Sequence, residues 1–249
     1  MPYLKGNCLS SELNHAAKMS SPVIADLEGE AVRLVESGRY EEARTALKKL
    51  LSRDRENLTG HFQMALVKMH LGHLPAAMKH ARTVLRLSPD EPNAWLNIGA
   101  IAQRMERLPL AIECYQKELV RDPESRESLF NLGICLHDLK QWGEAIRPLQ
   151  ECVRLKHCFD LVWPPLAECL YRTGAVNEEI AVYEWCLLQD SRNVWARANL
   201  GAALMGLGQS RRALVNLRIA RSQGADYPSL LNNLNRFAAD KNSWPELRS

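Results

Sequence analysis

Apolar residues recur along this chain at the three- and four-residue spacing that places side chains on one face of an α-helix. Leu129, Leu132, Gly133 and Leu136 follow this spacing, and they do not alternate with polar residues as a half-buried strand would. Turn residues interrupt the apolar segments at regular places, and the glycines among them are Gly38, Gly72, Gly174 and Gly208. Because glycine adopts the left-handed conformation at low cost, the pattern predicts pairs of antiparallel helices joined by tight turns.

Small residues mark a fixed period of 34 residues. When each copy is numbered from its first residue, position 8 holds Ala31, Ala65, Gly99, Gly133, Ala167 and Gly201. Position 20 holds alanine in five of six copies, namely Ala43, Ala77, Ala111, Ala145 and Ala213, with Glu179 in the remaining one. Small residues are expected where two helices approach closely. A fixed period of this size indicates an array of hairpins, in which each copy buries its core against its neighbours.

The copies share further motif residues, and the third copy shows them most fully. Its set is Trp95, Ile98, Gly99, Ala102, Ala111, Tyr115 and Pro123. This set resembles the tetratricopeptide repeat, whose pattern is W-x2-L-G-x2-Y, then A-x3-F and a terminal P. The resemblance implies an all-α fold, a right-handed superhelical solenoid of antiparallel helix hairpins. The six copies fall at residues 24–57, 58–91, 92–125, 126–159, 160–193 and 194–227.

Both ends of the chain fall outside the array. Residues 1–23 have no long apolar stretch and include Gly6 and Pro22, so we expect a flexible N-terminal tail or a short helix around residues 11–18. Residues 228–240 carry an apolar stripe, formed by Leu230, Leu231, Leu234 and Phe237. This stripe predicts a capping helix, because the last hairpin would otherwise expose its core face. We expect residues 241–249 to be frayed.

Composition limits the classes of partner. The chain has 32 basic and 29 acidic residues, a net charge of +3. This near balance argues against a nucleic-acid surface. No apolar run is long enough to span a membrane, and the first residues lack the basic start and apolar core of a secretory signal. The sequence therefore predicts a cytoplasmic protein without membrane insertion.

No catalytic or metal motif stands out. The chain lacks the H-E-x-x-H, phosphate-loop and G-x-S-x-G patterns, so we expect no enzymatic activity and no cofactor. Four cysteines recur in pairs at packing positions, Cys135 with Cys169 and Cys152 with Cys186, which favours small buried hydrophobic residues. Cys152, His157 and Cys158 form a partial ligand set, but no C-x2-C pair accompanies them. No metal site is predicted.

The resemblance implies that the first helix of each hairpin lines an inner groove. Position 6 of that helix holds Gln63, Asn97, Asn131 and Asn199 in four of the copies, with Pro165 interrupting the column. Asparagine offers a donor and an acceptor, so the column is suited to hydrogen-bond the backbone of an extended peptide. The alternative is that asparagine serves hairpin packing at this position. Both interpretations stay open.

Positions 12 and 13 add charged and aromatic residues to the predicted groove. Position 13 alternates in sign through Arg104, Asp138 and Arg172, and position 12 contributes His137 and Tyr171. These charges would meet a ligand or pair with one another across copies. Pairing with one another is favoured, because exposed ion pairs are frequent and individually weak.

Irregular residues cluster between the fourth and fifth copies. Pro148 falls inside a predicted second helix, His157 replaces the closing proline, and Pro164 and Pro165 follow Trp163. Since proline is tolerated in a first helical turn, we predict that the next helix begins near Trp163. One hypothesis is that this junction bends the array. The alternative is that these departures from the repeat pattern are sequence drift that the fold tolerates.

These patterns together predict a non-catalytic scaffold that binds a peptide segment of a protein partner in its groove, in the assembly of a multi-protein complex. Two alternatives remain. One is an RNA-binding helical-repeat protein, which the absence of a basic inner column disfavours. The other is a regulatory module that acts with a separately encoded enzyme.

Overall fold

A computed structural model describes residues 22–155 and 159–226 of the 249-residue chain. In these ranges the chain forms twelve α-helices and no strand, which confirms the all-α prediction. The chain divides into two compact units, residues 1–101 and 102–249, and the boundary falls inside the helix α5.

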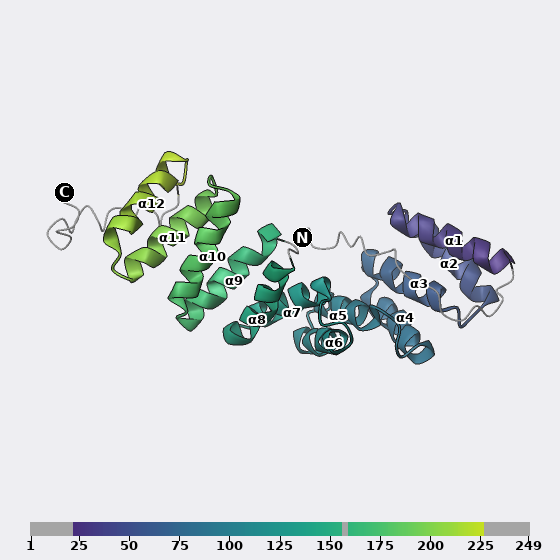
Figure 1. Cartoon of the computed structure of the whole chain (residues 1–249). Helices are drawn as coiled ribbons and strands as arrows, with labels where there is room; N and C mark the ends of the chain where they lie inside the picture. Colours follow the sequence, from purple (N-terminus) through teal and green to yellow (C-terminus); the bar gives the residue numbers. More distant parts are fainter. Residues whose placement is uncertain (1–21, 156–158, 227–249) are drawn as a thin grey trace. The chain divides into compact units, whose positions relative to one another are not determined.

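The first unit is built from paired helices. Helix α1 packs beside α2, and α3 packs beside α4 (Figure 1). Helix α3 also contacts both α1 and α2, so each hairpin buries an apolar face against the next one. The helices are α1 (Pro22–Glu36), α2 (Tyr40–Arg53), α3 (Leu58–His70), α4 (Leu74–Leu87) and the first part of α5 (Ala94–Arg104).

The second unit repeats the same arrangement. The hairpins α7 with α8, α9 with α10 and α11 with α12 follow one another along the chain, and α9 contacts both α7 and α8 (Figure 1). Its helices are α6 (Leu108–Arg121), α7 (Arg126–Asp138), α8 (Trp142–Arg154), α9 (Phe159–Thr173), α10 (Val176–Gln189), α11 (Val194–Gly206) and α12 (Ser210–Ser222).

The tight turns lie where the sequence predicts them. Gly38, Gly72, Gly174 and Gly208 all have φ between 72° and 79°. Glu106 and Lys140 occupy the equivalent turns without glycine, and they adopt the same left-handed conformation at φ 59° and 61°. The fold therefore imposes this conformation on residues that rarely adopt it.

The helix α9 begins earlier than predicted. It starts at Phe159 and contains Trp163, Pro164 and Pro165, so the predicted start near Trp163 is wrong. Val162 and Trp163 are buried, and the Trp163 ring lies against that of Trp185, with 4.6 Å between centroids. Burial of these side chains stabilises a helical turn that local preference disfavours. Pro148 is likewise buried inside α8.

Several predictions fall on residues that the structure does not describe. The N-terminal tail lies almost wholly in residues 1–21, and His157 of the irregular junction lies in residues 156–158. The capping helix at 228–240 and the frayed end at 241–249 also lie outside the described residues. These features, the repeat boundaries and the proposed bend stay predictions.

Candidate functional site

Two first helices of neighbouring hairpins are joined by one carboxylate. His137 lies in the last turn of α7, and its Nε2 lies 3.1 Å from Oε2 of Glu168 on α9. Because an ionised carboxylate only accepts hydrogen bonds, Nε2 donates and carries the proton. The other oxygen of Glu168 accepts from the guanidinium of Arg172 at 3.3 Å. Glu168 therefore links a histidine of one hairpin to an arginine of the next.

Trp142 completes this group from a third helix. It is the first residue of α8, directly after the turn that follows His137. The His137 ring meets the Trp142 ring edge-on, with centroids 5.1 Å apart, and Cζ of Arg172 lies 5.7 Å from the Trp142 ring centre. Edge-to-face packing of two rings and a cation placed over a ring are both favourable arrangements. We call His137, Trp142, Glu168 and Arg172 the α7–α9 cluster.

The cluster lies at the surface and carries charge. The hydrogen bond from His137 holds the pKa of the Glu168 carboxyl below its usual range; partial burial opposes this effect, and Arg172 adds to it. The side chains of His137, Glu168 and Arg172 are 22%, 42% and 53% exposed. Tyr171, next to Arg172, is 65% exposed. The arrangement therefore offers a guanidinium, a carboxylate and aromatic surface to a ligand.

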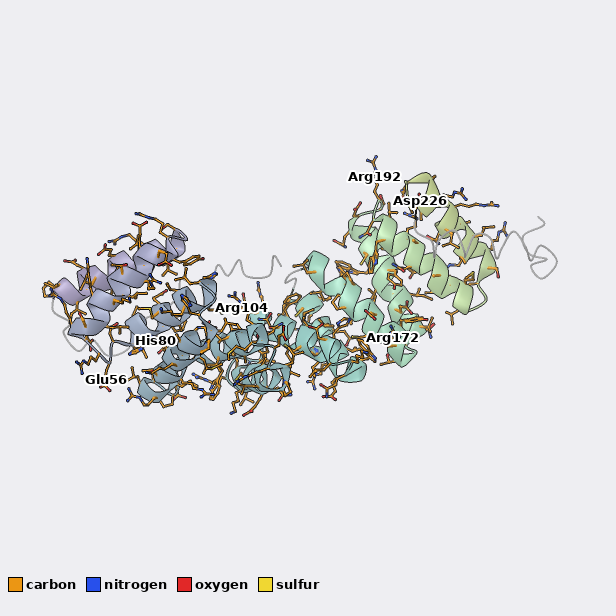
Figure 2. All side chains as sticks on the ribbon, turned by 180° about the vertical axis from the view of Figure 1, so that it is seen from behind. Glu56, His80, Arg104, Arg172, Arg192 and Asp226 are labelled. Atoms are coloured by element: carbon orange, nitrogen blue, oxygen red, sulfur yellow. The ribbon has the colours of Figure 1, made fainter. Side chains whose placement is uncertain are left out.

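Two of the predicted binding residues, His137 and Arg172, come together here through Glu168, and Tyr171 precedes Arg172 on α9. Arg172 lies at the surface of the second unit (Figure 2). Its partner is Glu168 on its own helix, and Asp138 instead lies 3.4 Å from Nδ1 of His137. Arg172 therefore does not form the predicted ion pair with Asp138, its neighbour in the position 13 column. Arg104 is also exposed (Figure 2).

The predicted amide column is less uniform than its sequence. Gln63 is only 2% exposed, and its Oε1 has no hydrogen-bond partner. Asn97 lines a narrow crevice of the first unit with Phe62 and Ala94. Asn131 and Asn199 are half-buried, and Nδ2 of Asn199 donates to the Trp195 carbonyl at 3.0 Å. The amides thus have different surroundings, and a shared role in hydrogen-bonding the backbone of an extended peptide stays a prediction.

Sequence reasoning missed Glu168 and Trp142. Glu168 stands four residues before Arg172, a spacing that pairs opposite charges on a helix. This spacing predicts an ion pair between Glu168 and Arg172, but it does not identify His137 as a second partner of Glu168. Trp142 begins a second helix, outside the columns expected to line a groove, and only the folded hairpin places it beside His137.

The cysteines of the described residues are structural. All five are free thiols and are buried, namely Cys114, Cys135, Cys152, Cys169 and Cys186. Burial raises the pKa of Cys135 to about 12 and that of Cys169 to about 11. These thiols therefore stay protonated at neutral pH. This burial confirms the interpretation of the recurring cysteines as small hydrophobic residues.

Neither a group of metal-binding side chains nor a helix suited to cross a membrane occurs among the described residues. Within residues 22–155 and 159–226, no three histidine, cysteine or acidic side chains gather closely enough to hold a metal ion. None of the helices described combines the length and the apolar character that crossing a membrane requires.

Known families match the chain over its central part. Two family models described as tetratricopeptide repeat match residues 34–103 and residues 90–156. The second of these includes His137 and Trp142 of the α7–α9 cluster.

Curated relatives match at low identity. Protein FlbA of Caulobacter vibrioides is 26% identical over 197 residues, which cover 78% of this chain and 33% of that protein. Hsp70-Hsp90 organizing protein 3 of Arabidopsis thaliana is 26% identical over 121 residues, which cover 48% of this chain and 22% of that protein. The chain spans about a third or less of the length of these relatives.

Solved structures share the arrangement of hairpins. YrrB, a tetratricopeptide repeat protein with an unusual peptide-binding site, superposes with a TM-score of 0.67 at 21% identity, covering 76% of this chain and 98% of that chain. PilF of Pseudomonas aeruginosa superposes with a TM-score of 0.63 at 17% identity, covering 86% of this chain and 97% of that chain. At these identities the likeness concerns the fold alone.

Proposed function

Because this chain belongs to the tetratricopeptide repeat family, we propose that it is a non-catalytic scaffold that binds a segment of a partner protein at the α7–α9 cluster. Proteins of this family bind other proteins through their hairpin arrays, which present extended surfaces. The proposed setting is the assembly of a multi-protein complex in the cytoplasm. YrrB, whose fold is similar, has a peptide-binding site, which supports this class of partner.

One observation carries the proposal. Glu168 bonds to both His137 and Arg172, while Arg172 remains half-exposed and Tyr171, the preceding residue in the sequence, is exposed. Exposed tyrosine and arginine side chains are enriched among the residues that dominate binding energy. Preorganised side chains also lose less conformational entropy on binding. This surface therefore meets the requirements of a protein-binding site better than the buried Gln63 does.

The chemistry of the site suggests how a segment would bind. Arg172 uses one of its nitrogens for Glu168, and a guanidinium has five N–H donors, so donors remain for a partner carbonyl or carboxylate. Tyr171 supplies apolar area and a hydroxyl. Asn131 lies on α7, and its amide makes no hydrogen bond within the described residues, so it is placed to bond a partner backbone.

The test is affinity capture with Arg172→Glu. This substitution removes the guanidinium N–H donors, and the new carboxylate repels Glu168. Arg154→Glu is a matched control, because Arg154 is also half-exposed, at 56%, and bonded to a glutamate of its own helix. We expect the wild type and R154E to capture the same proteins and R172E to lose them. Identical captures from all three would overturn the proposal. Capture that nuclease treatment abolishes would instead favour RNA binding.

A direct contact test complements the capture. A photoreactive phenylalanine analogue at Tyr171 is expected to crosslink the partner, since this side chain protrudes. The same analogue at Gln150, an exposed residue of α8 outside the cluster, serves as the control. Equal crosslinking at both positions would place the partner elsewhere.

A further inference from the structure

Helix α4 of the first unit carries a line of cations. Lys79, Arg82 and Arg86 follow one another at i, i+3 and i+7, so they lie along one face of the helix. All three are exposed. They line an open hollow of about 380 Å³ together with Pro75, Met78 and Thr83, and no acidic residue contributes to its lining.

These charges are weakly neutralised. Arg86 lies 3.4 Å from Oε1 of Glu56, and both side chains are exposed, so this pair contributes little. Glu56 is labelled at the surface of the first unit in Figure 2. Lys79 and Arg82 make no side-chain hydrogen bond or ion pair with the described residues. Two cations are therefore available to an external anion.

A neighbouring histidine reports the positive field. The pKa of His80 is lowered to about 4, chiefly by burial and then by the neighbouring His61, Lys68 and Lys79. The positive potential around α4 therefore also acts on His80, whose side chain does not line the hollow.

We propose that the exposed stripe of α4, formed by Lys79, Arg82 and Arg86, binds an acidic segment of a partner protein. The first and last of the three cations are seven positions apart, or roughly 10 Å along the helix axis. Two or three carboxylates of a short segment match that length. Arginine further allows bidentate pairing with a carboxylate, which adds direction to the attraction.

The extent of the stripe favours a short acidic segment over a nucleic acid. On α2, the positions equivalent to Pro75, Lys79, Arg82 and Arg86 hold Glu41, Thr45, Lys48 and Ser52. The line of cations therefore does not continue onto this neighbouring second helix of the same unit. Proteins that bind duplex DNA commonly make about six to ten phosphate contacts, more than one helix provides here.

This stripe is separate from the α7–α9 cluster. It belongs to the first unit, whereas the cluster belongs to the second, and they share no residue. Either proposal can therefore fail without the other.

Helix α12 offers a matched control. Arg211 and Arg218 occupy exposed positions of its corresponding stripe, with Val215 between them. The double variants Lys79→Glu with Arg82→Glu and Arg211→Glu with Arg218→Glu change the net charge of the chain equally. They differ only in which helix loses its cations. Circular dichroism of both variants checks that the helices remain folded.

The experiment measures binding of a fluorescein-labelled oligoglutamate to the full chain by fluorescence anisotropy. We expect K79E/R82E to weaken binding roughly tenfold, because each reversal replaces an attraction by a repulsion. R211E/R218E is expected to change it less than about twofold. Equal weakening by both variants, or no binding to the wild type, would overturn the proposal.

Two further readouts sharpen the test. Bound oligoglutamate is expected to raise the pKa of His80 in an NMR titration of the wild type, and an unchanged value would contradict binding at α4. An oligouridylate of equal charge is expected to bind more weakly than oligoglutamate. Tighter binding of the oligouridylate, lost in K79E/R82E, would assign the stripe to nucleic acid and overturn its assignment to a protein segment.

Discussion

Gly133 and Leu149 pack so closely that a β-carbon on Gly133 would lie 2.6 Å from Cδ2 of Leu149. Leu149 is fully buried on α8, and Gly133 faces it from α7 of the same hairpin. Gly201 and Leu217 form the same contact between α11 and α12, with Cγ of Leu217 at 2.6 Å. In these two copies, glycine at the small-residue position that recurs every 34 residues therefore leaves room for a leucine of the second helix.

Gly133→Ala is expected to lower stability. Alanine is favoured over glycine in a helix by about 0.5 to 1 kcal/mol. Against this gain, the new methyl group forces Leu149 to shift in a packed core, which typically costs about 1 to 3 kcal/mol. We expect a net loss of about 1 kcal/mol or more, measured by urea unfolding.

Gly143→Ala is the control for that loss. Gly143 lies in the first turn of α8, and a β-carbon there would meet nothing within 4 Å. We expect this variant to be as stable as the wild type or slightly more stable. A G133A protein that matched the stability of G143A would show that Leu149 can move aside without cost.

The turn residues predict opposite effects for two substitutions. Lys140 holds φ 61°, whereas Gly174 holds φ 77° in the equivalent turn, and a β-carbon on Gly174 would meet nothing within 4 Å. Lys140→Gly is expected to raise stability by up to about 1 kcal/mol, and Gly174→Ala to lower it by about 1 kcal/mol. Thermal unfolding of the two variants checks both signs. Equal shifts in the same direction would contradict a conformational cause.

Glu179 is expected to destabilise the fold at neutral pH. It occupies the position that holds alanine in the other five copies, and it is buried. Burial raises the pKa of its carboxyl, while the Tyr183 hydroxyl, which donates to Oε1 at 3.1 Å, lowers it. Because the folded pKa exceeds the usual 4.5, the stability that depends on the neutral form is present below pH 4.5 and is lost as pH rises through the folded pKa.

Glu179→Gln tests this sign. Glutamine keeps an acceptor for Tyr183 and carries no charge, so we expect the variant to be more stable than the wild type at pH 7. The difference should vanish when both proteins are unfolded by urea below pH 4.5. A variant less stable than the wild type at pH 7 would mean that the charged carboxylate stabilises the fold.

His61 and His80 predict a second dependence on pH. Their Nδ1 atoms lie 2.8 Å apart, and Nε2 of His61 lies 3.0 Å from the Arg55 carbonyl. Since Nε2 of neutral His61 donates to that carbonyl, its Nδ1 accepts and Nδ1 of His80 donates. A protonated His80 can still donate from Nδ1, so it is burial, and not this hydrogen bond, that chiefly favours its neutral form and lowers its pKa to about 4.

The neutral form of His80 contributes stability that is fully present above pH 6.5 and is lost as pH falls toward 4. We expect urea unfolding to show this decline in the wild type. The decline should be smaller in His80→Gln, which cannot take up the proton. An NMR titration that places the pKa of His80 at its ordinary value would contradict the prediction.

The helices, the turns and the small-residue columns follow from the sequence alone. These features are local or periodic, so a single copy and its spacing contain the signal. Gly174 in a left-handed turn and Ala43 in the core follow directly from it. The sequence also singled out His137, Tyr171 and Arg172 as candidates, because they occupy columns that the family resemblance places in a groove, and their role in binding stays a prediction.

The contacts of those residues depend instead on the tertiary structure. Glu168 joins His137 across 31 residues of sequence. Trp142 contacts His137 from α8, a second helix whose residues are not expected to line the groove. The start of α9 likewise depends on burial of Trp163 against Trp185, which overrides the local preference of the following prolines. Periodicity specifies which face of a helix is buried, but the partner of each side chain depends on how neighbouring hairpins stack.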